Sequence, residues 1–233
     1  MKTDITYMPV ELEFDNLEQI AAELNSVPDE YWFFSPYRDC NMLSLYSGGG
    51  KHKRSELMQH NDDFSWTEPA LEYCTVFIEF TEKHIHTWLK PAGRIIVIQT
   101  APGESISLHV DCSADTYNDL QHKFRLVPQG KKDTLWFKDR NGNKHFIDGK
   151  HPAYILDGSH PHGMDNNGDE IKYTICWGSP WNGENTEYDR IVEQNIDNPS
   201  TILRDDIGRV FEEQLFQEVK EGKEYWKNDY EAK

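Results

Sequence analysis

The sequence predicts a mainly β protein, an all-β sandwich or barrel with helices before and after it in the chain. Three observations lead to this prediction. Short runs rich in β-branched and aromatic residues recur between residues 73 and 180. Turn-forming pairs separate these runs, among them Pro102-Gly103, Asn141-Gly142 and Asp157-Gly158. Outside this region, the spacing of apolar residues changes to the helical period.

The N-terminal part, residues 1–72, is expected to be a helical and irregular support. Residues 15–25 predict a helix, because an apolar stripe at helical spacing is formed by Leu17, Ile20, Ala21 and Leu24. Asp15 and Glu18 fit a capping box at its start. Residues 47–56 carry three glycines and a basic cluster. They predict either a solvated loop or a mobile lid over something anionic.

The β region, taken as residues 73–181, contains eight runs that predict strands. They are residues 73–80, 94–101, 105–111, 122–127, 134–139, 144–148, 153–158 and 171–177. The clearest hairpin joins residues 134–139 to residues 144–148 through a turn at Asn141-Gly142-Asn143.

The C-terminal part, residues 182–233, is expected to be helical. Residues 185–196 carry an apolar face made by Tyr188, Ile191, Val192 and Ile196. Asn198-Pro199 then fits a helix cap with proline at the first helical position. The next helix has an apolar stripe made by Leu203, Ile207, Val210, Phe211 and Phe216. It is expected to pack on the barrel or to form a dimer contact, within a single domain of residues 1–233.

Composition excludes several classes of function. The net charge is −17, from 24 Lys and Arg against 41 Asp and Glu, which disfavours general nucleic-acid binding. No apolar run approaches the roughly 18 residues that a membrane helix needs, so no membrane partner is expected. None of the four cysteines lies in a C-x-x-C pair, and the N-terminus lacks an apolar signal core. A cytoplasmic protein with free thiols is therefore expected.

The strand predicted at residues 105–111 carries the first candidate metal ligands. Apolar residues alternate with polar ones along it, so His109 and Asp111 project from the same face. A histidine and a carboxylate placed in this way can bind one cation. A second histidine would complete a 2-His-1-carboxylate set, which leaves positions open for a cosubstrate and O2 in non-haem Fe(II) oxygenases. Zinc hydrolases can also use two histidines and a carboxylate, so the spacing alone does not name the metal.

The third ligand is expected from residues 154–168, where His160 and His162 flank Pro161. Either histidine could complete the set. His162 is favoured, because proline pushes the residue before it toward an extended conformation and away from the metal. Ten residues beyond His162 lies Lys172, a lone lysine in a β-rich, largely apolar strand. Such a lysine needs an anionic partner, for which a cosubstrate carboxylate is one candidate and a sheet-edge role the alternative.

These motifs resemble the Fe(II)/2-oxoglutarate-dependent oxygenases, which share an H-x-D motif, a later histidine and then a basic residue. Here the pattern is His109-Val110-Asp111, 50 intervening residues, His162, and Lys172 ten residues on. Within the superfamily, residues 109–130 and 154–181 most resemble the aspartyl/asparaginyl β-hydroxylase-like branch. Two features depart from that branch: its vertebrate members lack the carboxylate ligand, and its basic residue is usually Arg, whereas Lys172 resembles the prolyl 4-hydroxylase arrangement.

The resemblance implies a double-stranded β-helix (a jelly-roll, cupin-like fold) with the metal inside. It implies that His109, Asp111 and His162 bind Fe(II). It also implies that Lys172 pairs with 2-oxoglutarate, with Thr174 on the same strand face as a hydroxyl donor.

The branch also uses a basic pair on the strand at residues 122–127. If Phe124 and Leu126 pack outward, Arg125 points at the cosubstrate. If the strand is bulged, His122 takes that place. Arg125 is favoured.

The implied activity is hydroxylation of a Pro, Asp or Asn residue in a protein or peptide, or of a related small molecule. The reaction would convert 2-oxoglutarate and O2 to succinate and CO2. The rival hypothesis is a cupin-like barrel that binds a metal or a small acid without catalysis. The expected partner is a protein, peptide or amino-acid-like substrate, and the chain is expected to be a monomer or homodimer.

Overall fold

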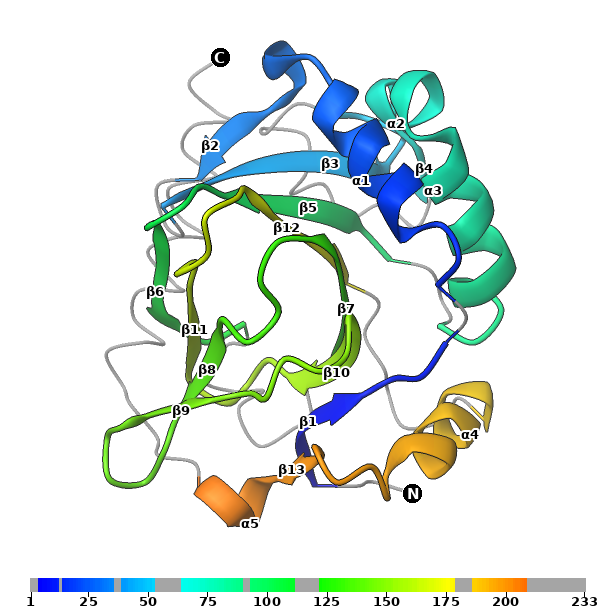
Figure 1. Ribbon diagram of the computed structural model, residues 1–233. Helices are drawn as coiled ribbons and strands as arrows, with labels where there is room; N and C mark the ends of the chain where they lie inside the picture. Colours follow the sequence, from blue (N-terminus) through cyan, green and yellow to red (C-terminus); the bar gives the residue numbers. More distant parts are fainter. Residues whose placement is uncertain are drawn as a thin grey trace.

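The computed structural model describes residues 4–12, 14–35, 39–52, 64–89, 93–111, 122–178 and 186–208. In this part of the chain, antiparallel strands form two facing sheets that curve into a barrel (Figure 1). The large sheet has the strand order β13-β1-β10-β7-β12-β5-β3-β2, with β4 paired to β3, and the small sheet has the order β6-β11-β8-β9.

Eight consecutive strands make the barrel itself. They are β5 (Ile95–Thr100), β6 (Ser105–His109), β7 (His122–Gln129), β8 (Leu135–Lys138), β9 (Lys144–Phe146), β10 (Ala153–Asp157), β11 (His162–Asp165) and β12 (Lys172–Trp177). Successive strands alternate between the two sheets, except that β8 and β9 form a hairpin within the small sheet. The barrel strands of the large sheet therefore lie in the order β10-β7-β12-β5 and face the order β6-β11-β8-β9. This is the topology of a double-stranded β-helix, so the predicted fold class is confirmed. The hairpin at Asn141-Gly142 is also confirmed, with Phe137 opposite His145.

The N-terminal part supplies strands as well as helices, which corrects the expectation of a purely helical and irregular support. The additional strands are β1 (Ile5–Pro9), β2 (Phe33–Ser35), β3 (Cys40–Gly48) and β4 (Phe64–Trp66). β3 extends the large sheet beyond β5, and β1 extends it beyond β10. All five residues of β1 are buried, so this strand lacks the alternation that marks a half-exposed strand.

The glycine-rich segment predicted as a solvated loop or a lid begins inside the sheet. Ser47 and Gly48 belong to β3 and pair with Ser65 and Phe64 of β4. Beyond them, Gly50 closes a turn by donating its N–H to the carbonyl of Ser47, at 3.1 Å. The rest of the segment from residue 53 lies outside the described residues.

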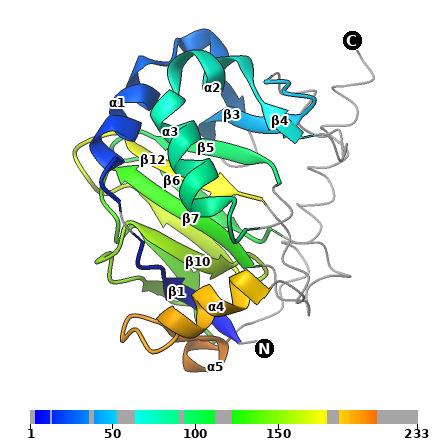
Figure 2. The same ribbon diagram turned by 90° about the vertical axis from the view of Figure 1, so that its right-hand side faces the viewer.

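Helices cover the outer face of the large sheet (Figure 2). They are α1 (Leu17–Ser26), the single turn η1 (Asp29–Tyr31), α2 (Glu68–Tyr73), α3 (Thr75–Phe80) and η3 (Thr81–Ile85). The prediction of a strand at residues 73–80 is therefore wrong. Cys74, Phe77 and Phe80 are buried at three-residue spacing, which places them on one face of a helix packed on the sheet.

Two predicted helix caps are corrected. The N-cap of α1 is Asn16, and no side chain caps this helix, so the Asp15–Glu18 capping box does not form. Asn198 and Pro199 belong to a turn in which the Asn198 side chain accepts the N–H of Ser200 at 2.9 Å.

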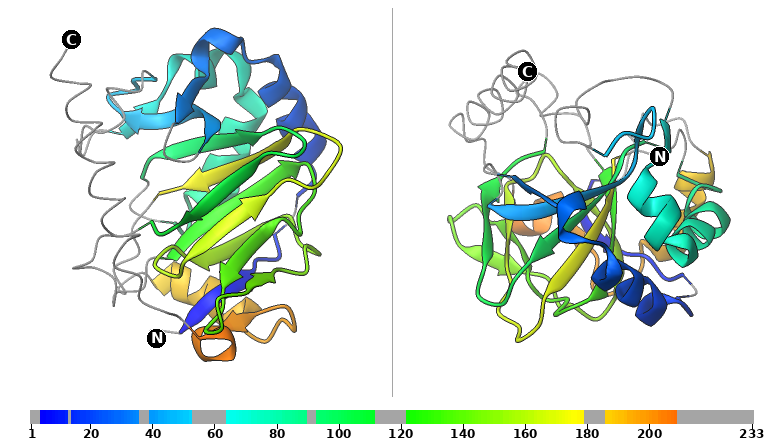
Figure 3. Two further views of the ribbon diagram at one scale, coloured as in Figure 1. Left: turned by 90° about the vertical axis from the view of Figure 1, so that its left-hand side faces the viewer. Right: turned by 90° about the horizontal axis from the view of Figure 1, so that it is seen from above.

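The C-terminal part continues as α4 (Thr186–Asn195), β13 (Ile202–Leu203) and α5 (Arg204–Ile207). These elements lie against β1 at one edge of the large sheet (Figure 3). The remainder of the second predicted helix, from residue 209, lies outside the described residues. No helix in the described ranges is long and apolar enough to cross a membrane.

The hydrophobic core has two parts. The larger part lies between the helices and the large sheet and includes Phe77, Phe124 and Trp177. Smaller clusters fill the space between the two sheets, including Ile98 and Met164 in one and Phe137 and Tyr154 in the other. Residues of one strand therefore divide between an outward face packed on helices and an inward face that lines the barrel.

Candidate metal centre

His109 and Asp111 lie where β6 ends. His109 is the last residue of the strand, and Asp111 follows it after Val110. The backbone N–H of Asp111 donates to the carbonyl of Gly158 at 2.7 Å. This bond holds Asp111 against the turn between β10 and β11.

The register of the small sheet brings His162 to the same place. His162 begins β11 and pairs directly with His109 of β6. The two imidazole rings have their centroids 4.4 Å apart. His160, the other candidate for the third ligand, points away: its Nε2 lies 2.9 Å from the carbonyl of Lys138, and its Nδ1 lies 3.4 Å from Thr6 Oγ1.

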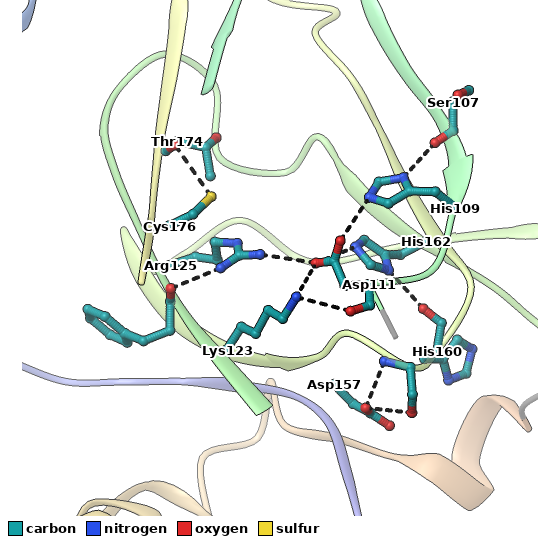
Figure 4. Close-up of polar contacts among 12 residues, drawn as sticks. Ser107, His109, Asp111, Lys123, Arg125, Asp157, His160, His162, Thr174 and Cys176 are labelled. Atoms are coloured by element: carbon teal, nitrogen blue, oxygen red, sulfur yellow. Dashed lines mark hydrogen bonds and ion pairs between the residues drawn. The ribbon is translucent and has the colours of Figure 1, made fainter. Parts of the chain in front are cut away.

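The three side chains direct their ligand atoms at one point (Figure 4). The Nε2 atoms of His109 and His162 lie 3.8 Å and 3.9 Å from the carboxylate oxygens of Asp111. One ligand atom from each of the three side chains lies within 4.8 Å of the others. Among the described residues, this is the one such group of three or more histidine, cysteine, aspartate or glutamate residues.

Backbone carbonyls fix the orientation of both imidazoles. The Nδ1 of His109 lies 2.8 Å from the carbonyl of Ser107, and the Nδ1 of His162 lies 2.8 Å from the carbonyl of His160. A carbonyl only accepts, so in the neutral imidazole Nδ1 carries the proton and Nε2 keeps its lone pair. Metal-binding histidines are held in this way.

The donor set fits a divalent cation. Ligand atoms about 2.1 Å from a common metal lie roughly 3 to 3.5 Å apart. The His–Asp separations of 3.8 Å and 3.9 Å therefore need to close by less than about 1 Å, and any other pair of ligand atoms, within 4.8 Å, by less than about 2 Å. Two neutral nitrogens and one carboxylate, all from one side, leave the other coordination positions open.

The side chain of Asp111 is buried and is the acidic member of the cluster. Its side chain is 3% exposed, and its Oδ2 lies 3.1 Å from Lys123 Nζ and 3.3 Å from an Arg125 nitrogen. Charge pairing of this kind compensates the cost of burying a carboxylate. Both cations come from the inward face of β7.

Arg125, Thr174 and Cys176 line the inside of the barrel next to this cluster. Phe124 and Leu126 pack outward into the helix-covered core, so Arg125 between them faces inward. Thr174 lies on the inward face of β12, where its hydroxyl is 3.9 Å from the sulfur of Met164 on β11. Cys176 is the register partner of Arg125 across the large sheet.

Lys172 begins β12 and is 1% exposed. It alternates with Tyr173, which packs in the outer core, so its side chain is directed inward with that of Thr174. Its Nζ donates to the carbonyl of Lys131 at 2.5 Å. Burial lowers the pKa of this lysine to about 7, although the charge of Asp133 partly opposes the shift.

The structure leaves His122 outside this group. It lies on the outward face of β7, with Nε2 3.2 Å from the carbonyl of Ile5 and Nδ1 2.9 Å from the hydroxyl of Tyr188. Burial lowers the pKa of His122. These two contacts join β7 to β1 and to α4.

Two parts of the site were not expected from the sequence. The sequence assigns Lys123 no role at the metal, yet among the described ion pairs it lies closest to the Asp111 carboxylate, at 3.1 Å. The carbonyls of Ser107, Gly158 and His160 orient the ligands through the backbone, so no side-chain signal could have identified them.

Fold and cluster together define the class of this protein: a double-stranded β-helix whose barrel carries a 2-His-1-carboxylate cluster. No protein-family model and no curated protein matches the sequence.

Several solved structures are similar in fold. A prolyl-4-hydroxylase from Pseudomonas putida has 13% identity and a TM-score of 0.45, over 77% of this chain and 94% of that chain. A prolyl hydroxylase from Trichoplax adhaerens, in complex with a hypoxia inducible factor peptide fragment, has 11% identity and a TM-score of 0.44, over 76% and 84%. A 2OG-Fe(II) oxygenase family oxidoreductase from Burkholderia pseudomallei has 13% identity and a TM-score of 0.43, over 78% and 88%. Similarities at this level establish neither a family nor a function for this chain.

Proposed function

We propose that this protein is an Fe(II)/2-oxoglutarate-dependent oxygenase that hydroxylates its substrate. The observation that supports this proposal is the His109-Asp111-His162 cluster, with its ligand atoms within 4.8 Å of one another beside the inward-facing cations of a double-stranded β-helix. A three-ligand set suits a metal that must also bind a cosubstrate and O2. Inward cations suit a cosubstrate with two carboxylates.

His109, Asp111 and His162 would hold the metal. When bound, Fe(II) supplies the activation of O2, in a reaction that yields succinate, CO2 and a hydroxylated product. The backbone carbonyls behind His109 and His162 favour the tautomer with the proton on Nδ1, so Nε2 is the atom directed at the metal position. Asp111 partly neutralises the dication, and Lys123 and Arg125 orient its carboxylate.

Lys172, Arg125 and Thr174 would bind 2-oxoglutarate. All three face the inside of the barrel, and Thr174 can donate a hydroxyl hydrogen bond to a carboxylate. Lys172 would give up its bond to the Lys131 carbonyl and pair with the distal carboxylate. The apolar side chains of Ile96, Ile98 and Met164 exclude water from this part of the interior.

The proposed substrate is a Pro, Asp or Asn residue in a protein or peptide, with a related small molecule as the second candidate. This part of the proposal follows the sequence resemblance to the aspartyl/asparaginyl β-hydroxylase-like branch. A panel of peptides containing Pro, Asp or Asn, analysed by mass spectrometry for a gain of one oxygen atom, tests it directly.

A succinate-release assay with Fe(II), ascorbate and 2-oxoglutarate tests the activity before the substrate is known. The proposal expects slow succinate release by the unaltered protein and loss of release in His162→Ala. The matched control is His145→Ala, since His145 is an exposed histidine on β9 outside the cluster. Metal binding without any succinate release would instead support the non-catalytic, cupin-like barrel.

A further inference from the structure

The turn between β10 and β11, residues 157–162, contacts two of the three candidate metal ligands through its backbone. We call it the ligand turn. The carbonyl of Gly158 accepts the N–H of Asp111 at 2.7 Å. The carbonyl of His160 lies 2.8 Å from Nδ1 of His162, which ends the turn. The conformation of this turn therefore sets the position of Asp111 and the orientation of the His162 ring.

A buried carboxylate organises the ligand turn from within. Asp157 is 0% exposed, and its Oδ1 accepts both the N–H and the hydroxyl of Ser159, at 2.9 Å and 2.7 Å. The carbonyl of Asp157 accepts the N–H of His160 at 3.1 Å. Figure 4 shows Asp157 below the metal-ligand cluster. Burial alone would raise the pKa of Asp157, but the hydrogen bonds from Ser159 and the charge of Arg204 lower it, so the carboxylate is ionised.

The charge that balances Asp157 comes from a distant part of the chain. Arg204, the first residue of α5, donates to Asp157 Oδ2 at 2.6 Å. The Nε of the same guanidinium lies 2.9 Å from Asp4, and the N–H of Arg204 donates to the Asp4 carbonyl at 2.8 Å. Arg204 thus ties the ligand turn to both the N-terminal and the C-terminal segments. A planar guanidinium can hold two carboxylates at once, which a lysine ammonium does less well.

We infer that Arg204 is a positioning residue for the metal centre, acting through Asp157 and the ligand turn on Asp111 and His162. This inference rests on the metal site of the proposed function and does not depend on the reaction carried out there. A buried carboxylate that loses the cation paired with it must rearrange or take up a proton. Either change alters its bonds to Ser159 and thereby the carbonyls that orient the two ligands.

Cobalt(II) binding tests the inference without requiring turnover. The full chain carrying Arg204→Gln is compared with the unaltered protein by calorimetric titration and by the visible absorption of bound Co(II). The matched control is Arg190→Gln, because Arg190 is an exposed arginine of α4 that pairs with Glu187. Changing groups that orient metal ligands typically costs about 10- to 100-fold in metal affinity. We expect Arg204→Gln to weaken Co(II) binding about tenfold and to change the spectrum, and Arg190→Gln to do neither.

Arg204→Lys provides the second measurement and serves if Arg204→Gln does not fold. It keeps the positive charge but cannot hold Asp157 and Asp4 in the same way, so its Co(II) affinity should lie between those of the unaltered protein and the Gln variant. Unchanged Co(II) affinity and spectrum in either folded variant, even with a lower melting temperature, would show that Arg204 only stabilises the fold. If the unaltered protein binds Co(II) but releases no succinate in the Fe(II) assay, the proposed activity is contradicted. The inference about Arg204 is not affected by that result.

Discussion

Replacing Lys172 by Met should have opposite effects on stability and on 2-oxoglutarate binding. The lysine is 1% exposed, and burial lowers its pKa from 10.5 to about 7. Between these two values the unfolded chain binds more protons than the folded one, so stability rises with pH through this window. The cost of burying the amine is of the order of 3 kcal/mol at about pH 8, at 1.36 kcal/mol per pKa unit. Lys172→Met removes this cost and should raise the melting temperature.

The same substitution should weaken 2-oxoglutarate binding. A charge-assisted hydrogen bond to a carboxylate contributes about 1.5 to 3 kcal/mol, which corresponds to about 10- to 100-fold in affinity. Only the ammonium form can make this bond. Because the pKa of Lys172 in the free protein is about 7, binding must be accompanied by proton uptake at higher pH. The apparent affinity of the unaltered protein should then fall by up to about tenfold per pH unit above that pKa.

Calorimetric titration of 2-oxoglutarate into Mn(II)-loaded protein, between about pH 6.5 and about pH 8.5, measures the 2-oxoglutarate affinity and the accompanying proton uptake. The buffer dependence of the binding heat reports the proton uptake. Lys172→Met should show weak, nearly pH-independent binding and unchanged Mn(II) affinity. Equal 2-oxoglutarate affinity in the two proteins across this range would remove Lys172 from the site and leave Arg125 as the main candidate.

Three further predictions concern the metal and the fold. Adding Mn(II) at about 100 times its dissociation constant should stabilise the chelator-treated protein by about 2.7 kcal/mol in thermal unfolding, and His162→Ala should abolish this shift; an equal shift in that variant would place the metal elsewhere. Gly163→Ala should cost about 1 to 3 kcal/mol in urea unfolding, because its Cβ would lie 2.4 Å from the Trp136 ring, and a neutral result would mean that the ring moves freely. Tyr188→Phe should cost about 1 to 3 kcal/mol by leaving His122 Nδ1 without its hydroxyl donor, with 2-oxoglutarate affinity unchanged; a weaker affinity would connect His122 to the site.

The β-barrel could be predicted from the sequence because its strands carry β-branched residues between clear turn signals. Two errors have physical causes. Residues 73–80 are as rich in β-branched and aromatic residues as a strand, but the three-residue spacing of Cys74, Phe77 and Phe80 was the better guide. β1 was missed because every residue of it is buried, so no alternation marks it. Its burial depends on β10 and β13, which are distant in the sequence.

The candidate site could be predicted as residue types in a pattern, and much less as geometry. Strand alternation placed His109 and Asp111 together, and the order of motifs pointed to His160 or His162. Only the register of β11 against β6 brings His162 opposite His109. The ion pair between Asp157 and Arg204 joins residues 47 positions apart, and a local sequence pattern does not predict such a contact.

The position of β12 between β5 and β7 has a consequence for how the chain is made. β5 and β7 are synthesised before β12, which lies between them and pairs with both. Neither strand can form its pairing with β12 until β12 has left the ribosome. At about 5 to 20 residues per second, this delay lasts on the order of several seconds. During that time the apolar edge of β5, with the sequence IIVIQT, is open to pairing with other nascent chains. We therefore expect newly made protein to depend on chaperones until Trp177 has emerged, and truncations that end before Lys172 to aggregate.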